Sequence, residues 1–428
     1  MQVGTFGFIF IILAGISYNT HSPLFFKLDP WDRIALLVLT VLVYIYLYAK
    51  QSSQKRFSYL LILFLPLGWM LYKELRYQYW RYQVLHTEAN VLQELGEHFI
   101  VGYTSTEEIQ ALLKRGAVGG IFVTHRNAKH KSKSELTKEI AWLQAQSIKK
   151  LPLYIVSDQE GGKVSRLTPP LSQMPTLSQI IHNKPGEEAI FSYARNKAKR
   201  LSELGVNTNF SPVVDLKQID KRSKIDLHSR IWERAISESP QITSKVAGLY
   251  SRELVRGGIV PVLKHFPGLG GVKADTHFFT AAHPLPYKEI WQTSLYPFRM
   301  ISQENPGVMI MLGHVLIPEI DPQYPTSYSE KVIQSVIRQR MAFSGVLVSD
   351  DFSMGPVFYD KDGMGGVCKR ALQAGLDIIL VSYDPRLLYQ GLYATIQEYK
   401  KNPAFRKKVQ QSTKRIWQHK KSMGFSFD

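Results

Sequence analysis

Short apolar runs alternate with longer segments of helical composition from about residue 98 onward. Buried parallel strands read as continuous apolar stretches, and strands that alternate with helices predict βα units with a parallel sheet. Spacings of about 20 to 50 residues leave room for one helix between neighbouring runs. Eight such runs are present, at residues 98–103, 118–123, 153–158, 208–215, 259–265, 308–314, 346–351 and 378–383.

These eight runs predict an α/β fold, a TIM-type (β/α)8 barrel over residues 98–428. Such a barrel usually has about 250 residues and tolerates insertions. The alternative is a doubly wound open sheet, which usually has a Gly-rich phosphate-binding turn after its first strand. Here that turn reads Thr-Ser-Thr-Glu-Glu over 104–108, which is typical of a helix N-terminus. The pattern therefore favours the barrel.

The first 75 residues have a different pattern, which predicts a membrane region. No Lys, Arg, Asp or Glu occurs in residues 1–26, and apolar runs without charge occupy 6–18, 34–49 and 57–72. None of the three shows the polar face of a surface helix. The second and third runs are shorter than the roughly 20 residues that a bilayer core requires, so interfacial Trp, Tyr, Lys and Arg would complete them. We predict about three transmembrane helices in residues 1–75, followed by a linker helix over 76–97.

Two other interpretations of this region remain open. The three runs are also compatible with buried helices of a soluble domain, and residues 1–20 with a cleavable signal peptide that lacks the usual basic start. For a multi-pass membrane protein, the loop with Lys50, Lys55 and Arg56 faces the cytoplasm by the positive-inside rule. This orientation places the barrel on the non-cytoplasmic side, although cations just after residue 72 favour the opposite orientation.

The net charge of +18 is distributed over scattered Lys and Arg residues rather than over a basic stripe with interleaved aromatic residues. Nucleic acid is therefore not an expected partner. An anionic membrane surface, including the lipid bilayer itself, or an anionic polymer is more compatible with this charge. The single cysteine, Cys368, excludes an internal disulfide and a Cys-rich metal site. The sequence indicates no oligomeric state.

Several predicted strands end on polar side chains. The carboxyl ends of the strands of a parallel barrel meet at one mouth, where such barrels carry their chemistry. A group of carboxylates, histidines and a lysine without a cysteine cluster favours acid–base or nucleophilic chemistry on a polyhydroxylated substrate. No metal site is expected, because Asp350 and Asp351 lack a nearby His at ligand spacing. The residues at the predicted ends are Asp158, Asn209, Asp215, Lys264, His265, His314, Asp350 and Asp351.

Four segments resemble, in the same order, the signatures of glycoside hydrolase family 3, and in particular its bacterial β-N-acetylglucosaminidase branch. They are residues 157–166 (SDQEGGKVSR), 209–215 (NFSPVVD), 264–268 (KHFPG) and 348–354 (VSDDFSM). The likeness covers about residues 92–425. It implies a retaining exo-β-N-acetylglucosaminidase that acts on terminal N-acetylhexosamine of cell-wall-derived glycans without a cofactor.

The resemblance also implies roles for three residues in catalysis. Asp350 matches the position of the nucleophile, whereas Asp351 is better suited to a structural role. Most retaining glycosidases use a second carboxylic acid as acid/base, but this branch uses a His–Asp pair on a mobile loop. Asp275 and His277 match that pair, with Asp275 orienting the imidazole. A surface histidine with an incidental neighbour is the alternative.

Five further residues match positions that bind the sugar in this family. Asp158 would accept hydrogen bonds from sugar hydroxyls. Lys264 and His265 match the pair that binds hydroxyl groups. Arg166 matches the arginine that ends its motif, and Arg230 matches a further arginine more loosely.

Two residues depart from the family pattern. Leu269 replaces a His and Gly271 replaces an Asp in the loop after the fifth predicted strand. The loss of polar groups and the added glycine predict weaker sugar binding or a looser loop. Two alternative functions therefore remain open: a membrane-tethered sugar sensor without catalysis, and a family 3 glycosidase or phosphorylase with another sugar specificity.

Overall fold

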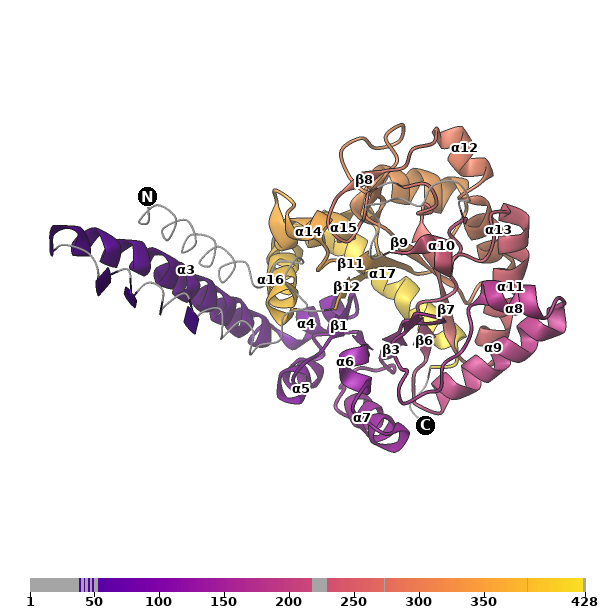
Figure 1. Cartoon of the computed structure of the whole chain (residues 1–428), viewed down its shortest axis with the longest axis horizontal. Coiled ribbons are helices and arrows are strands. Elements are labelled where there is room, and N and C mark those ends of the chain that lie inside the picture. Colours follow the sequence, from indigo (N-terminus) through magenta and orange to yellow (C-terminus); the bar gives the residue numbers. More distant parts are fainter. Residues whose placement is uncertain are drawn as a thin grey trace. The chain divides into compact units, whose positions relative to one another are not determined.

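The computed structural model describes residues 38–39, 42, 45–46, 48–49, 53–217, 229–272, 274–382 and 384–425. The chain divides into two compact units, Met1–Gln83 and Val84–Asp428. In the second unit, parallel strands close into a barrel that is surrounded by helices (Figure 1). The α/β barrel prediction is thereby confirmed.

Eight strands form the barrel, and their spatial order follows their order in the chain. The first and last strands pair in parallel, with Phe99 opposite Ile379, which closes the ring. Each strand coincides with one of the eight apolar runs, because a strand covered on both faces needs apolar side chains throughout. The strands are β1 (Phe99–Gly102), β2 (Gly120–Phe122), β3 (Tyr154–Ser157), β6 (Thr208–Asn209), β7 (Val260–Phe266), β9 (Met309–Leu312), β11 (Leu347–Asp351) and β12 (Ile378–Val381).

Helices precede the first barrel strand, connect the strands and follow the last one. The longer ones are α4 (Ala89–Gly96), α5 (Thr106–Arg115), α7 (Lys133–Ala145), α8 (Leu177–Asn183), α9 (Glu187–Ser202), α11 (Pro240–Arg256), α12 (Tyr287–Gln292), α13 (Tyr296–Glu304), the π-helix η3 (Val332–Arg340), α15 (Gly363–Ala374), α16 (Pro385–Lys401) and α17 (Pro403–Ser422).

Shorter helices and strand pairs lie within the loops. They are the helices α6 (His125–Ala128), α10 (Ile231–Arg234), α14 (Gly355–Phe358) and the 3-10 turn η2 (Thr326–Tyr328), the antiparallel pair β4 (Gln159–Gly161) with β5 (Val164–Ser165), and the parallel pair β8 (Ala281–Ala282) with β10 (Val315–Leu316).

The turn after β1 begins a helix, as its sequence predicts. The Ser105 hydroxyl accepts a hydrogen bond from the Glu108 amide at 3.2 Å, which satisfies one of the unpaired donors at the start of α5. Gly116 ends the helix with a φ of 66°, a conformation that glycine adopts without strain. This turn contains no phosphate-binding glycine motif, in agreement with a barrel rather than a nucleotide-binding open sheet.

The amino ends of the barrel strands are closed by the C-terminal helix. Tyr154 inside the barrel contacts His419 of α17, with 3.0 Å between its hydroxyl and the ring Nδ1. Glu97, two residues before β1, is buried and pairs with Lys420 at 3.0 Å and Lys149 at 3.3 Å. These polar contacts stabilise the end of the barrel that lies opposite the carboxyl ends of the strands.

The prediction of transmembrane helices is not supported by the structure. The first two apolar runs lie largely outside the described residues. The third lies in α3 (Ser53–Leu85). Among the helices that the structure describes, none combines the length with the apolar character that a bilayer crossing needs. The run at 57–72 has only 16 residues before Lys73, fewer than the roughly 20 of a typical span.

The predicted linker helix is two helices rather than one. α3 continues through the apolar run to Leu85, since neither Gly nor Pro interrupts residues 69–85. A turn at residues 86–88 then separates it from α4. In α4, Val91, Leu92 and Leu95 are buried, so this helix belongs to the packed barrel unit.

Candidate active site

Lys264 lies at the centre of a charged cluster at the carboxyl ends of β3 and β7. Its side chain is only 2% exposed. Its Nζ lies 2.6 Å from Asp158 Oδ1 and 2.6 Å from Glu160 Oε1. The three residues come from the end of β3, the hairpin strand β4 and β7, so the barrel brings together positions about 100 residues apart, as its topology requires. Asp158 and Lys264 therefore share one polar mouth, as predicted, and the structure adds that they form an ion pair there.

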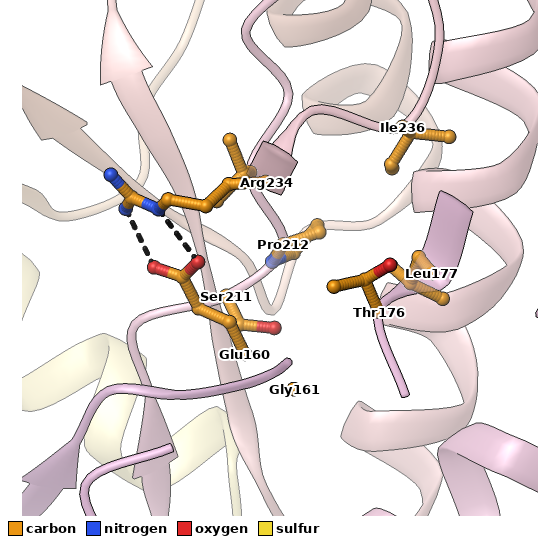
Figure 2. A pocket seen from close by; sticks show the side chains of 9 residues that line it. Glu160, Gly161, Thr176, Leu177, Ser211, Pro212, Arg234 and Ile236 are labelled. Atoms are coloured by element: carbon orange, nitrogen blue, oxygen red, sulfur yellow. Dashed lines mark hydrogen bonds and ion pairs between the residues drawn. The ribbon is translucent and has the colours of Figure 1, made fainter. Parts of the chain in front are cut away.

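Arg234 completes this cluster. Its Nε donates to Glu160 Oε2 at 2.9 Å and its Nη2 donates to Oε1 at 2.7 Å, a bidentate pair that Figure 2 shows. Burial opposes ionisation of Glu160, yet the charges of Arg234 and Lys264 hold the pKa of this carboxyl well below its usual range. Glu160 is therefore an anion that forms ion pairs with both Arg234 and Lys264 at the mouth of the barrel.

Arg230, the arginine expected here from the sequence, takes a different place. It precedes α10 with a φ of 45°, and its guanidinium pairs with Glu233 of the same short helix. Arg234 is one helical turn further on, and only that turn carries a guanidinium to Glu160. In the sequence, the signal that points to Arg234 is a second arginine four residues after Arg230. Local pattern does not predict the helical turn of α10 that separates the two side chains.

His265 is fixed by the buried carboxylate of Asp215. Its Nδ1 lies 2.7 Å from Asp215 Oδ2, while the amides of His265 and Leu269 donate to Oδ1 at 3.1 and 2.7 Å. Arg234 Nη2 lies 3.3 Å from the other ring nitrogen, Nε2. In this arrangement Nδ1 carries the proton toward Asp215 and Nε2 accepts from Arg234, which sets one tautomer and orientation of the ring.

The two departures from the family pattern have structural explanations. Leu269 is 7% exposed and packs with Ile231, Ala235 and Val315 in a small apolar cluster. Gly271 has a φ of 84°, which disfavours a residue with a side chain. The loop after β7 therefore gains apolar packing at one position and a turn at the other. The weaker sugar binding expected from the lost polar groups and the looser loop expected from the added glycine stay predictions.

His277 and Asp275 form the expected pair. His277 Nδ1 lies 2.8 Å from Asp275 Oδ1, which also accepts a hydrogen bond from the His277 amide at 3.0 Å. Asp275 is 2% exposed, whereas the imidazole is 39% exposed. The Gly355 amide donates to the His277 carbonyl at 2.8 Å, so this loop is attached to the segment that follows Asp350 and Asp351.

Asp350 and Asp351, at the end of β11, point to different surroundings. Burial would raise the pKa of Asp350, but His265, His314 and His277, together with a 2.8 Å hydrogen bond from the Asp351 amide, lower it below its usual range. The barrel therefore brings His277 and His265 within electrostatic reach of an ionised Asp350.

Asp351 is instead bonded into the fold. Its Oδ1 accepts from the amides of Ser353 and Ser382 at 2.9 and 3.1 Å, and its Oδ2 accepts from the Ser382 hydroxyl. Burial raises the pKa of Asp351 to about 6. These contacts tie β11 to the end of β12, so the two adjacent carboxylates have separate roles.

The remaining expected residue, Arg166, lies near the cluster without joining it. Its side chain is exposed, and its amide donates to the Asp158 carbonyl at 3.0 Å. His314, below the mouth, is buried between Ser327 and the Asp351 carbonyl, at 2.8 and 3.0 Å. Within the described residues, no group of three or more His, Cys, Asp or Glu side chains is arranged to hold a metal ion.

A small pocket lies beside the Glu160–Arg234 pair (Figure 2). It is also lined by Gly161, Thr176, Leu177, Ser211, Pro212, Val213 and Ile236. Its volume of about 10 Å³ is far below the several hundred Å³ of a typical ligand site. This pocket does not include Asp350 and is not the sugar site.

Comparison with known proteins agrees with this geometry. The Glycosyl hydrolase family 3 N terminal domain matches residues 90–418. A Beta-hexosaminidase of Nitrosomonas eutropha is 35% identical over 294 residues, which cover 67% of this chain and 80% of that protein. A Beta-hexosaminidase of Xanthomonas oryzae pv. oryzae is 32% identical over 303 residues, which cover 69% and 86%.

Solved structures show the same fold. A glycoside hydrolase family 3 β-N-acetylglucosaminidase from Paenibacillus aligns with a TM-score of 0.71 and 25% identity, over 78% of this chain and 62% of that chain. A family 3 glycosyl hydrolase from Mycobacterium smegmatis aligns with a TM-score of 0.68 and 27% identity, over 78% and 98%. The order of the motifs, the closed barrel and these matches together show that the chain belongs to glycosyl hydrolase family 3.

Proposed function

We propose that this protein is a retaining β-N-acetylglucosaminidase that releases terminal N-acetylhexosamine from glycans. The observation that carries the proposal is Asp350 at the carboxyl end of β11, where histidines lower its pKa, at the same end of the barrel as the Lys264 cluster of β3 and β7. A carboxylate held as an anion at neutral pH is suited to nucleophilic attack. The relatives named Beta-hexosaminidase and β-N-acetylglucosaminidase supply the sugar preference.

In the first step, an Asp350 carboxylate oxygen bonds to the anomeric carbon, and the bond from that carbon to the leaving-group oxygen breaks. His277 gives its Nε2 proton to that oxygen. In the second step, His277 takes a proton from water, the water oxygen bonds to the anomeric carbon, and the bond to Asp350 breaks. Asp275, bonded to Nδ1 at 2.8 Å, orients the ring and stabilises its protonated form.

The sugar hydroxyls would be held by charged groups around Lys264. Asp158 has acceptors and Lys264 has donors at the mouth, and each charge is already neutralised by a partner at 2.6 Å. A charged pair of this kind exchanges hydrogen bonds with hydroxyls without burying an unpaired charge. We assign the guanidinium of this site to Arg234, beside the expected Arg166, and not to Arg230, which pairs with Glu233 of its own short helix.

The test is hydrolysis of a 4-nitrophenyl N-acetyl-β-glucosaminide by the full chain, compared with the corresponding glucoside. Turnover of the first and not of the second is expected, and equal turnover would contradict the proposed sugar preference. Turnover that requires added phosphate would instead identify a phosphorylase. The sensor hypothesis loses its main motivation, because Leu269 and Gly271 are explained by packing and backbone conformation.

We further propose that residues 1–75 attach the barrel to a membrane, on the non-cytoplasmic side. The support is the absence of charge from residues 1–26 and 34–49 and the positions of Lys50, Lys55 and Arg56. A reporter fused after residue 85 tests this placement. Activity of a reporter that works only in the cytoplasm would contradict it, and recovery of the full chain without detergent would contradict the attachment.

A further inference from the structure

One buried lysine lies directly behind the sugar-binding cluster. Lys197, on α9, is 1% exposed. Its Nζ donates to the Gln159 carbonyl at 3.0 Å, to the Glu160 carbonyl, and to the Tyr193 hydroxyl at 2.8 Å. Each of its three N–H donors therefore has an acceptor. The rings of Tyr193 and Tyr250 lie 4.6 and 5.7 Å from the same Nζ.

A buried ammonium group loses much hydration free energy, so an apolar residue would be the simpler choice at this inward position of α9. Two of the acceptors of Lys197 are main-chain carbonyls rather than carboxylates. Burial lowers the pKa of Lys197 to about 7, and the nearby Glu160 charge opposes that change. The hydrogen bonds of the Lys197 amino group hold a stretch of main chain, the peptide that joins Gln159 to Glu160.

The same stretch is held from another side by Asn209 at the end of β6. Asn209 Oδ1 accepts from the Gln159 amide at 2.9 Å, and Nδ2 donates to the Gln159 carbonyl at 3.1 Å. The next side chain along the chain, Glu160, binds Lys264 and Arg234. The orientation of this main chain therefore decides where the Glu160 carboxylate lies.

We propose that Lys197 is a positioning residue for the sugar-binding cluster. Its ammonium group fixes the main chain at Gln159 and Glu160, and so directs the Glu160 carboxylate toward Lys264 and Arg234. Lys197 acts through these residues. The kinetic consequence of this inference rests on the proposed function, whereas its structural consequence does not.

The experiment compares Lys197→Met with Lys420→Met in the full chain. Both lysines are fully buried and paired, but Lys420 pairs with Glu97 at the opposite end of the barrel. For Lys197→Met we expect KM for the nitrophenyl substrate to rise about tenfold while kcat stays within about threefold, because ground-state sugar binding is lost. Lys420→Met should lower the unfolding temperature and leave KM unchanged. Equal KM values in wild type and Lys197→Met would overturn the proposal.

A crystal structure of Lys197→Met provides a readout that does not depend on turnover. We expect the Glu160 carboxylate to lose at least one of its two hydrogen bonds to Arg234, and retention of both would overturn the proposal. If the wild-type chain hydrolyses no glycoside, the proposed function is wrong. The crystal structure of Lys197→Met then tests the positioning role of Lys197 by itself. Lys197→Arg keeps the charge and its donors, so we expect its KM to equal that of the wild type. If Lys197→Met does not fold, Lys197→Arg takes its place in the kinetic and the crystallographic measurement. In that variant we expect an unchanged KM and both hydrogen bonds between Glu160 and Arg234.

Discussion

Arg234 and Glu160 form a bidentate ion pair, with hydrogen bonds of 2.9 and 2.7 Å, that joins the loop after β6 to the hairpin after β3. Both side chains are nearly buried, at 12% and 7% exposed. Removal of one partner would leave the other as an uncompensated buried charge, which is far more damaging than the loss of a surface ion pair.

Arg234→Ala is therefore expected to lower kcat/KM by about 30-fold to 1000-fold, equivalent to about 2–4 kcal/mol of binding energy, and to act mainly on KM. Steady-state kinetics on the nitrophenyl substrate measure this change. Arg230→Ala is the matched control, because Arg230 is partly exposed and pairs within its own short helix. It should change kcat/KM by less than about threefold, the effect of losing a surface pair. A larger loss in Arg230→Ala than in Arg234→Ala would contradict the assignment.

The adjacent carboxylates of β11 should respond differently to the same substitution. Asp350→Asn is expected to reduce kcat by at least about a thousandfold, since an amide cannot replace the nucleophile. Asp351→Asn should retain measurable turnover but lower the unfolding temperature, because Asp351 bonds Ser353 and Ser382. Thermal unfolding and single-turnover assays separate the two effects. Full activity in Asp350→Asn would exclude it as nucleophile.

The His277–Asp275 pair should matter most for poor leaving groups. A general acid protonates the leaving-group oxygen, so its loss is tolerated when that oxygen leaves readily. His277→Ala is expected to lower kcat by about 100-fold to 10,000-fold for an alkyl or sugar leaving group, and far less for dinitrophenolate. A loss that is equal for all leaving groups would argue against an acid/base role. Asp275→Asn should show the same trend with a smaller loss, since it disturbs only the orientation and charge of the ring.

Stability should fall as the pH is lowered from about 6.5 to 4. Burial lowers the pKa of His98, His283 and His419 from 6.5 to about 4 in each case. In this window the unfolded chain binds more protons at these positions than the folded chain. Each histidine therefore lowers the unfolding free energy by about 1.4 kcal/mol per unit fall in pH. Asp351, whose pKa is raised to about 6, binds its proton in the folded state and opposes this trend by a similar amount.

Denaturant unfolding at several pH values measures this slope. His419→Gln should flatten it, because the amide does not titrate in this range. An unfolding free energy that is constant or rises as the pH falls from 6.5 to 4 would contradict this prediction, and so would an unchanged slope in His419→Gln.

Much of the barrel follows from local sequence alone. The eight apolar runs correspond to eight strands because a parallel strand covered on both faces must be apolar along its whole length. The polar residues that end those runs, such as Asp158, Lys264 and Asp350, must then share one mouth, because parallel strands in a closed barrel place their carboxyl ends together. The Asp275–His277 pair is likewise local, since only one residue lies between these positions.

Other features depend on tertiary contacts that no local pattern contains. Arg234, rather than Arg230, reaches the charged cluster because one turn of α10 directs it to the carboxylate of Glu160, more than 70 residues earlier in the chain. Histidines gathered by the barrel lower the pKa of Asp350, whereas burial raises the pKa of Asp351 although hydrogen bonds from Ser353 and Ser382 oppose that rise. Adjacent residues in a strand point to opposite sides, and only the folded chain determines what each side contains.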